Sequence, residues 1–289
     1  MAPVQNPHLS LDLVADVQQL FAFPFMVNAL EAGTIVAVLA AIVGWYMVLR
    51  RQSFAGHTLS VMAFPGATGA ALAGLPTALG YYLACGAAAL AMGRTSRAPA
   101  RGFGAETALI GTVQTVGLAA GYLFLSLNHE ILSGTETLLF GTFLGVTTGQ
   151  VLTLLIVAVA TLAVLALGAR PLLFSTVDRD VARASGVPVA ILDVAFLVIL
   201  GLAVAATSQI TGALLVFAVL VAPPATAQLI TTRPLAGLAL SVVFALLVVW
   251  LGLGVAYFSI YPVGFYTTTF AFGLYVAVWT TRWTLTRRA

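Results

Sequence analysis

His57 is the side chain in this sequence whose type and position best suit metal chemistry. It follows the pair Arg50-Arg51 and lies near the start of a long run of apolar and small residues. Imidazole binds zinc and other borderline ions, whereas manganese prefers carboxylate and carbonyl oxygens. One imidazole holds an ion weakly, but two could approach each other if a second copy of the chain faced the first across a two-fold axis. The alternative is that His57 is a polar residue beside Arg51 with no ligand role.

Further along the same run, Ser60 is a second candidate for an ion path, although a hydroxyl there equally suits packing between helices. Pro65-Gly66 predicts an interruption near the middle of the run, and Pro223-Pro224 predicts another in a later run. Broken helices often mark transport sites, because their freed carbonyl groups line a cavity. Kinks that merely fit the helices together are the equal alternative. A stripe of small residues at every fourth position predicts close contact with another helix: Gly66, Ala70 and Gly74.

Carboxylates near the ends of apolar runs are the remaining candidates for chemistry. Glu31 is expected near the outer mouth, where it could attract an incoming cation. Asp193 and Glu106 lie close to the arginine-bearing ends of their runs, so we expect them to pair with arginine or to cap helices. The pair His129-Glu130 is expected in an outer loop, either solvated or in contact with a partner. Three polar residues are expected to form hydrogen bonds between helices: Thr112, Gln114 and Thr115.

Composition defines the elements that must position these residues. The chain has 289 residues, of which 61% are hydrophobic and 7% are charged. A soluble domain carries roughly 25% charged residues, so the sequence predicts an all-α polytopic membrane protein with one membrane domain. Nine apolar runs of spanning length are expected to be helices: 28–49, 54–75, 78–93, 104–126, 148–168, 190–207, 210–230, 236–257 and 263–281. Because the runs at 78–93 and 190–207 are short, eight or ten spans remain possible.

Orientation follows from the twelve arginines, since the sequence contains no lysine. All of them fall on alternate loops, and the positive-inside rule makes that side cytoplasmic. The N-terminus is then outside and the C-terminus is cytoplasmic. Residues 1–27 are expected to form an outer N-terminal segment and residues 28–282 the membrane domain. Within the outer segment, residues 10–23 are either a frayed terminus or an amphipathic helix on the lipid surface. Such a helix has an apolar face of Leu13, Val17, Leu20 and Phe21 and a polar face that includes Asp12 and Asp16.

The same composition excludes several classes of function. A phosphate-binding P-loop requires lysine, so any ATP hydrolysis belongs to another chain. Arginines scattered singly and in pairs do not form a nucleic-acid surface. The three histidines are far apart in the sequence, which excludes the His-Glu-x-x-His cluster of an intramembrane metalloprotease. A carrier driven by an ion gradient usually needs several buried carboxylates or histidines, and the middles of these runs contain almost none. Cys85, the only cysteine, is expected to be inert packing.

Residues 174–190 form the one substantial segment between runs on the arginine side. Ser175 followed by Asp178 matches a capping box, and Gly186 followed by Pro188 is a stop signal, so a short helix is expected. Such a helix either docks into a groove on a partner or simply joins two spans. Its apolar stripe consists of Val177, Val181 and Ala184. Its charged face consists of Asp178, Arg179, Asp180 and Arg183.

This segment and its neighbours resemble the permease subunits of metal-ion ABC importers, the zinc/manganese family. The family's spacing of phenylalanine, an acidic residue, alanine and glycine is matched here, and its later leucine-aspartate is matched by Asp193. The opening VLRRQSFAG, the segment LLFGTFLGV at 138–146 and the run ITGALLVFAVLVAPPATA follow the family in the same order. Together they span most of the chain between residues 25 and 280.

The resemblance implies the ABC importer permease fold in the inner membrane of a prokaryote. It implies a complex of two permeases, two cytoplasmic ATPases and an extracytoplasmic metal-binding protein. ATP would bind to the ATPase, no cofactor would be held permanently, and the ion would cross by alternating access. Residues 174–188 would be the coupling helix, contacting the ATPase through Phe174, Asp178, Arg179, Ala182, Arg183 and Gly186.

The sequence departs from the family at the residues that would identify the ion. The family usually reads Asp-Ala-Leu-Ser-His where this chain reads HTLSV at residues 57–61. The aspartate is replaced by His57 and the histidine by Val61, so one ligand remains, and loss of the carboxylate favours zinc over manganese. We therefore expect a permease for divalent cations, zinc first, with an ion path near His57, Ser60 and Glu31. Manganese or iron is the alternative, and a carrier driven by an ion gradient is the alternative of another class.

Overall fold

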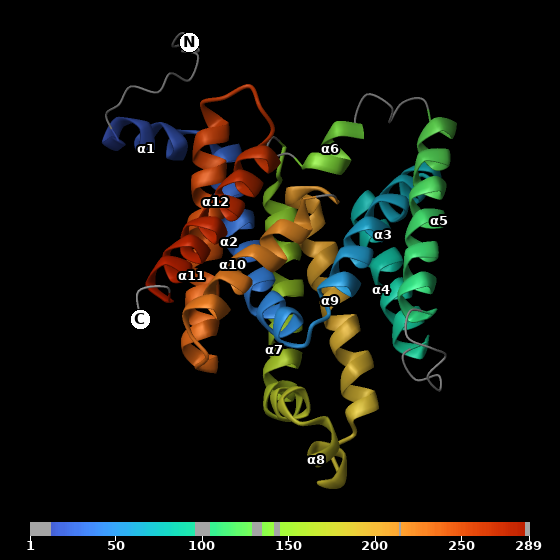
Figure 1. The fold of residues 1–289 in the computed structure, drawn as a ribbon. Helices are drawn as coiled ribbons and strands as arrows, with labels where there is room; N and C mark the ends of the chain where they lie inside the picture. Colours follow the sequence, from blue (N-terminus) through green and yellow to red (C-terminus); the bar gives the residue numbers. More distant parts are fainter. Residues whose placement is uncertain (1–12, 96–104, 129–134, 142–144, 214, 287–289) are drawn as a thin grey trace, which may run out of the picture.

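The computed structural model describes residues 13–95, 105–128, 135–141, 145–213 and 215–286. Every regular element in these ranges is a helix (Figure 1). The helices are α1 (Leu13–Ala22), α2 (Pro24–Leu49), α3 (Ser53–Leu72), α4 (Thr77–Thr95), α5 (Ala105–Leu127), α6 (Thr135–Phe140), α7 (Thr148–Val177), α8 (Arg179–Ala184), α9 (Val189–Thr211), α10 (Val216–Ile230), α11 (Pro234–Tyr257) and α12 (Val263–Thr286).

Each apolar run of the sequence corresponds to one of the longer helices, which confirms the all-α polytopic fold. Five stretches within the described ranges are helical, long and apolar enough to cross a membrane: α2, residues 110–127 of α5, α7, α9 and α11. The boundaries differ in two places. The run at 148–168 is part of a longer helix that ends at Val177, and the run at 210–230 is divided at Gly212. Gly212 has φ +77°, which ends α9 and turns the chain into α10. The number of spans and the side that faces the cytoplasm stay predictions.

The helices pack in two groups joined mainly by α9. Helices α3, α4 and α5 form one group, and α2, α10, α11 and α12 form the other (Figure 1). Helix α9 contacts α3 and α4 on one side and α2 and α7 on the other. Helix α2 is the most enclosed of the candidate spans, with residues such as Met26, Leu39 and Met47 fully buried. The α2–α3 turn therefore connects the two groups directly.

The prolines lie inside helices and do not interrupt them. Helix α3 continues through Pro65 and Gly66, and α10 continues through Pro223 and Pro224. The predicted helix breaks are therefore not observed. A proline removes one backbone donor, and in a membrane bundle neighbouring side chains can satisfy the carbonyls this leaves.

Small residues bring α3 and α4 into close contact. A Cβ atom added at Gly66 would collide with the carbonyl oxygen of Gly80, and one added at Gly80 would lie 2.7 Å from the Ala70 Cβ. The predicted stripe therefore holds for Gly66 and Ala70. Gly74 does not belong to it, because it lies beyond the end of α3 with φ +70°, and a Cβ atom added there would meet no other atom within 4 Å.

The N-terminal segment differs from its prediction in its boundary and in its faces. Helix α2 already begins at Pro24, so the boundary placed after residue 27 falls inside a helix. In α1, Asp16 is 6% exposed and Phe21 is 60% exposed. Asp16, which the prediction assigned to the polar face, is therefore buried, whereas Phe21 is exposed, as an apolar side chain that faces lipid would be. Helix α1 also contacts α2.

Candidate functional site

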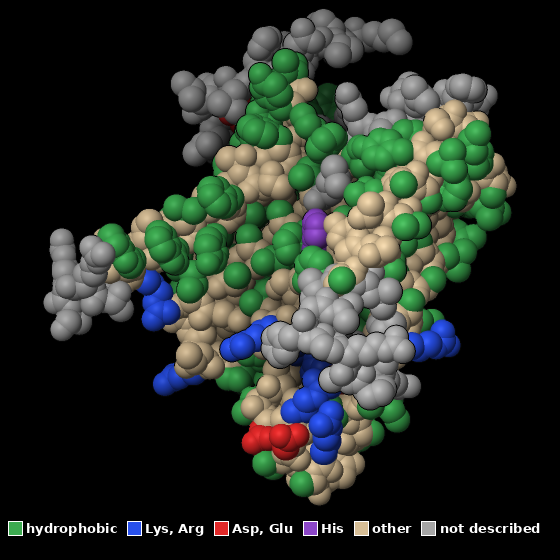
Figure 2. All heavy atoms as spheres, turned by 45° about the vertical axis from the view of Figure 1, so that its right-hand side comes forward, with side chains coloured by type: hydrophobic (Ala, Val, Ile, Leu, Met, Phe, Trp, Pro, Cys, Tyr) green, Lys and Arg blue, Asp and Glu red, His purple; other side chains and the backbone are tan. Residues whose placement is uncertain are grey.

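His57 lies at a three-helix contact. Its imidazole Nε2 is 3.2 Å from the Gln114 side-chain nitrogen on α5, and its ring packs edge-on against Phe217 of α10 at 5.1 Å between centroids. Figure 2 shows a histidine side chain at the surface of the described part, well above the end where arginine side chains gather. The structure therefore brings His57 together with a polar side chain that the sequence analysis had assigned only to helix packing.

The Nδ1 atom of His57 is buried and has no hydrogen-bond partner among the described residues. When the Gln114 amide donates to Nε2, the neutral ring carries its proton on Nδ1, where no acceptor faces it. When the carboxamide is rotated so that its oxygen accepts from Nε2–H, Nδ1 presents a lone pair. An orienting hydrogen bond on one ring nitrogen and a free lone pair on the other is the arrangement of a metal-binding histidine.

The other predicted ion-path residues do not join His57. Ser60 is fully buried and its hydroxyl donates to the His57 carbonyl at 2.7 Å, so it is turned back onto its own helix. The hydroxyls of Thr112 and Thr115 likewise donate to carbonyls of their own helix, at Ala108 and Gly111. Hydroxyls in apolar helices commonly bond in this way. The interhelical role predicted for the polar residues of α5 therefore holds for Gln114 alone.

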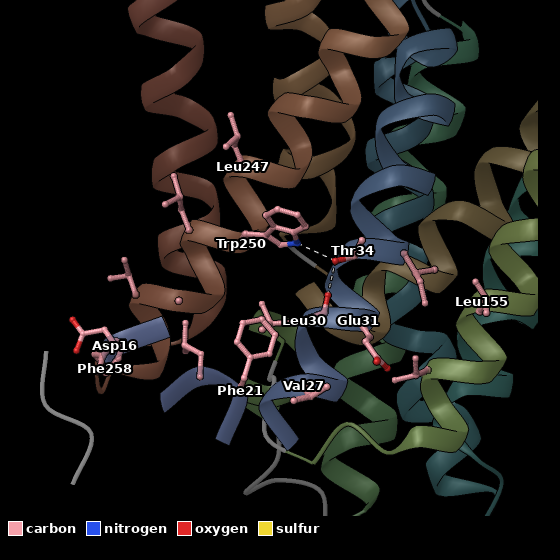
Figure 3. A pocket seen from close by; sticks show the side chains of 16 residues that line it. Asp16, Phe21, Val27, Leu30, Glu31, Thr34, Leu155, Leu247, Trp250 and Phe258 are labelled. Carbon is pink, nitrogen blue, oxygen red and sulfur yellow. Dashed lines mark hydrogen bonds between the residues drawn. The ribbon is translucent and has the colours of Figure 1, made fainter. Parts of the chain in front are cut away.

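Glu31 lies in a different part of the molecule from His57. It lines a cavity of about 960 Å³ between α1, α2, α7 and α11, together with Asp16 (Figure 3). In the same cavity the Trp250 indole donates to the Thr34 hydroxyl at 2.9 Å. Glu31 and the α3 end of α2 are 18 residues apart along one helix, which is roughly 27 Å at 1.5 Å per residue. One chain therefore does not bring Glu31 and His57 to a single ion.

No group of three or more His, Cys, Asp and Glu side chains that could hold a metal ion is found in the described ranges. Three predicted candidates cannot be placed. His129 and Glu130 lie outside the described residues, and so does the side chain of Glu106, whose backbone belongs to α5. Cys85 is fully buried and its thiol faces the Leu59 carbonyl. This environment agrees with the expectation that Cys85 is an inert packing residue.

A cluster of charged side chains lies at the α2 end of the α2–α3 turn, whereas His57 lies beyond its α3 end. Arg50 and Arg179 each contact one carboxylate oxygen of Asp193, with Arg50 Nη2 at 2.5 Å from Oδ1. Arg50 also donates to the Thr176 hydroxyl at 2.9 Å and lies over the Phe196 ring. Burial lowers the pKa of Arg50 from its usual value, and the adjacent Asp193 carboxylate acts in the opposite direction. The expectation that Asp193 pairs with arginine is met, and it pairs with two.

Helix α8 follows α7 after a single residue and is capped differently from the prediction. Asp178 is its N-cap, and its carboxylate accepts hydrogen bonds from the backbone N–H groups of Asp180 and Val181. The predicted box headed by Ser175 is wrong, because Ser175 lies in α7 and donates to the Leu172 carbonyl. The helix ends at the predicted signal: Gly186 has φ +82° and donates to the Arg183 carbonyl.

The surface of α8 and the end of α7 is partly apolar and partly charged. Phe174 belongs to α7 and is 40% exposed, while Val177 and Val181 are exposed by 78% and 50%. Ala182 is the only buried residue of α8 and holds the helix against the bundle. Figure 2 shows arginine side chains gathered toward the end of the molecule that carries this helix. Such a surface, apolar in part and cationic at its margin, can dock a protein.

Comparison with known proteins defines the class. The chain matches the ABC 3 transport family over residues 22–282, and it belongs to that family. It is 29% identical over 242 residues to the manganese transport system membrane protein MntC of Halalkalibacterium halodurans, covering 84% of this chain and 81% of the relative. It is 32% identical over 215 residues to the chelated iron transport system membrane protein YfeC of Yersinia pestis, covering 74% and 72%.

Solved structures show the same fold. PsaBC from Streptococcus pneumoniae in complex with Fab contains a chain that superposes with a TM-score of 0.82 at 25% identity, covering 92% of this chain and 95% of that one. An inward-facing putative metal-chelate type ABC transporter superposes with a TM-score of 0.67 at 17% identity and shows the fold alone. The family and the ABC permease fold expected from the sequence are thus confirmed, as is a multi-pass protein of the prokaryotic inner membrane.

Proposed function

We propose that this chain is the permease subunit of an ATP-driven importer for a divalent transition-metal ion. Family membership carries the proposal, because curated relatives aligned over most of their length are named for manganese and chelated iron transport. A chain without lysine has no P-loop, so ATP is hydrolysed on a separate cytoplasmic ATPase that docks on α8. A second copy of the chain and an extracytoplasmic metal-binding protein complete the complex.

The ion passes the face that carries His57. A single imidazole oriented by Gln114 is a weak ligand, which suits a path that must release its cargo. Two copies across a two-fold axis supply two imidazoles. Imidazole favours zinc over manganese, which prefers oxygen ligands. Zinc is therefore the ion that the residues at this site favour.

Manganese or iron is the second candidate, favoured by the names of the relatives. Under that alternative His57 is a packing residue and selectivity belongs to the binding protein. The two candidates make different predictions for the His57 variants.

Uptake of radiolabelled zinc, manganese and iron into proteoliposomes holding the complete complex tests the proposal. For zinc selected at His57, His57→Ala lowers zinc uptake at least about tenfold, because the substitution removes the imidazole from both copies of the permease. His57→Asp, which restores the family's carboxylate, shifts uptake toward manganese. Thr115→Ala is the matched control, because Thr115 neighbours Gln114 but bonds only to its own helix.

Three outcomes separate the possibilities. Zinc uptake that collapses in His57→Ala and persists in Thr115→Ala supports zinc selection at this site. Manganese or iron uptake that is unaffected by His57→Ala rejects it in favour of the second candidate. A complex that carries none of the three ions contradicts the proposed function as a whole.

A further inference from the structure

Asp193 connects three helices and a turn through its two carboxylate oxygens. The residue lies in the second turn of α9 and its side chain is 12% exposed. Oδ1 accepts from Arg50 at the end of α2, and Oδ2 accepts from Arg179, the first residue of α8. The cluster contains two arginines and one carboxylate. Without Asp193 the two guanidinium groups would face each other with no counter-charge between them.

The Arg50 side of this connection is fixed. Its side chain is 5% exposed, and Thr176 and Phe196 hold it on two further sides. Arg50 is the C-cap of α2, and α3 starts only three residues later, at Ser53. Within that turn Arg51 adopts φ +57°. A turn this short and constrained has little slack, so a displacement of Arg50 displaces the start of α3, the helix that carries His57.

The Arg179 side is attached lightly. The Arg179 side chain is 52% exposed, and α8 projects from the end of the bundle (Figure 1). Ala182 is the one residue of α8 that is buried. The other charged residues of α8 do not contact Asp193: Arg183 lies 3.6 Å from Asp180 on the same helix. A partner that moves α8 therefore pulls on Asp193 through Arg179.

We propose that Asp193 is a positioning residue that transmits movement of α8 to the α2–α3 turn, with Arg179 as the input contact and Arg50 as the output contact. The inference rests on the proposed function in one respect, namely that an ATPase docks on α8. It does not depend on which ion is transported. This role differs from a purely structural one in what it predicts when the contacts of Asp193 are broken. The complex still assembles, but the conformation around His57 no longer changes when ATP binds.

Nucleotide-dependent labelling of a cysteine in place of His57 measures this transmission without using an ion. The native thiol is removed by Cys85→Ala, and His57→Cys serves as the reporter in the full complex with its ATPase and binding protein. The labelling rate with a membrane-impermeant maleimide is compared with and without ATP. In Arg179→Gln and Asp193→Asn, the ratio of the two rates falls about tenfold, a loss within the range for coupled residues in contact. Asp193→Asn lies on α9, outside the α8 surface that docks the ATPase, so ATP hydrolysis and co-purification of the ATPase are retained in this variant.

Arg183→Gln is the matched control, because it removes the same charge from the same helix but does not touch Asp193. It keeps the ATP-dependent change in labelling. In the double variant Arg179→Gln/Asp193→Asn, the ratio of the two labelling rates falls no further than in either single variant, because both substitutions interrupt the same connection.

Equal loss in Arg183→Gln overturns the inference, because the effect then belongs to docking in general. Retention of the labelling change in Arg179→Gln also overturns it, and this variant remains decisive if Asp193→Asn does not assemble, since Arg179 is half exposed. If the labelling rate of His57→Cys does not change with ATP in the complex that carries no substitution at Arg179 or Asp193, the proposed function is contradicted, and this inference with it. A parent complex that responds to ATP while Arg179→Gln does not supports the inference whichever ion is carried.

Discussion

The Asp193 cluster and the His57 site lie at the two ends of one short connection, and their polar atoms are satisfied in opposite ways. In the cluster, both carboxylate oxygens of Asp193 are bound and Arg50 has partners on three sides. At the other site, the buried Nδ1 of His57 has no partner in the described part of the chain. A satisfied buried network rigidifies a structure, whereas an unsatisfied buried group is costly and is typical of functional sites. The contrast agrees with the two proposed roles, in which the Asp193 cluster transmits movement and His57 binds the ion.

The largest effect should come from removing Arg50. Arg50→Ala leaves the buried Asp193 carboxylate with only the half-exposed Arg179 as its partner, and breaking a buried pair costs up to about 3–5 kcal/mol of unfolding free energy. Arg51→Ala is the control, since it removes the adjacent arginine, which is exposed, and should cost less than about 1 kcal/mol. Unfolding in detergent micelles measures both. Equal destabilisation by the two variants would show that the cluster is not what stabilises this end.

The next effect tests whether α3, the helix of His57, is held by packing. Gly80→Ala places a Cβ against the Gly66 carbonyl and the Ala70 Cβ, and such overpacking costs about 1–3 kcal/mol. Gly86→Ala on the same helix meets open space and should stabilise by up to about 1 kcal/mol, because alanine favours a helix over glycine. Thermal unfolding of the two variants should therefore shift in opposite directions. Shifts in the same direction would refute the close α3–α4 contact.

A smaller effect concerns the input helix of the Asp193 cluster. Asp178→Ala removes the N-cap of α8, which costs about 1 kcal/mol and should speed amide exchange at Asp180 and Val181 roughly fivefold. Asp180→Ala is the control, because its carboxylate is exposed and pairs only loosely with Arg183 at 3.6 Å. Hydrogen exchange of the intact permease measures both. Unchanged exchange in Asp178→Ala would mean that the surrounding chain, and not the cap, holds α8.

The smallest effect on stability is expected at the His57 site. Replacing both partners in His57→Leu/Gln114→Leu removes a half-satisfied polar pair, so the free energy of unfolding should change by less than about 1 kcal/mol or rise. Zinc uptake should fall in the same variant under the proposed function. A loss of stability comparable to that of Arg50→Ala would show that His57 is structural and would remove the contrast between the two regions.

The sequence alone determined the class of protein and the positions of its main helices. Hydropathy identifies them because every backbone polar group in a bilayer must be satisfied within a helix, so long apolar runs have only one regular structure available. It also determined the end of α8, since Gly186 adopts the left-handed conformation that such an end requires. The ordered motifs identified the family, and the absence of lysine excluded ATP binding by a P-loop. These features depend on residues close in sequence.

Only the tertiary structure decided which polar residues meet. Asp193 is 143 residues from Arg50, and Gln114 is 57 residues from His57, so no local pattern could pair them. Local rules placed the cap of α8 at Ser175 and helix breaks at the prolines, but the bundle extends α7 to Val177 and continues α3 and α10 through their prolines. Asp16, which the helical pattern assigned to the polar face, is likewise buried in the folded chain. In each case the physical reason is the same: periodicity states which face of a helix is apolar, whereas the identity of the neighbouring helix is set by packing between distant parts of the chain.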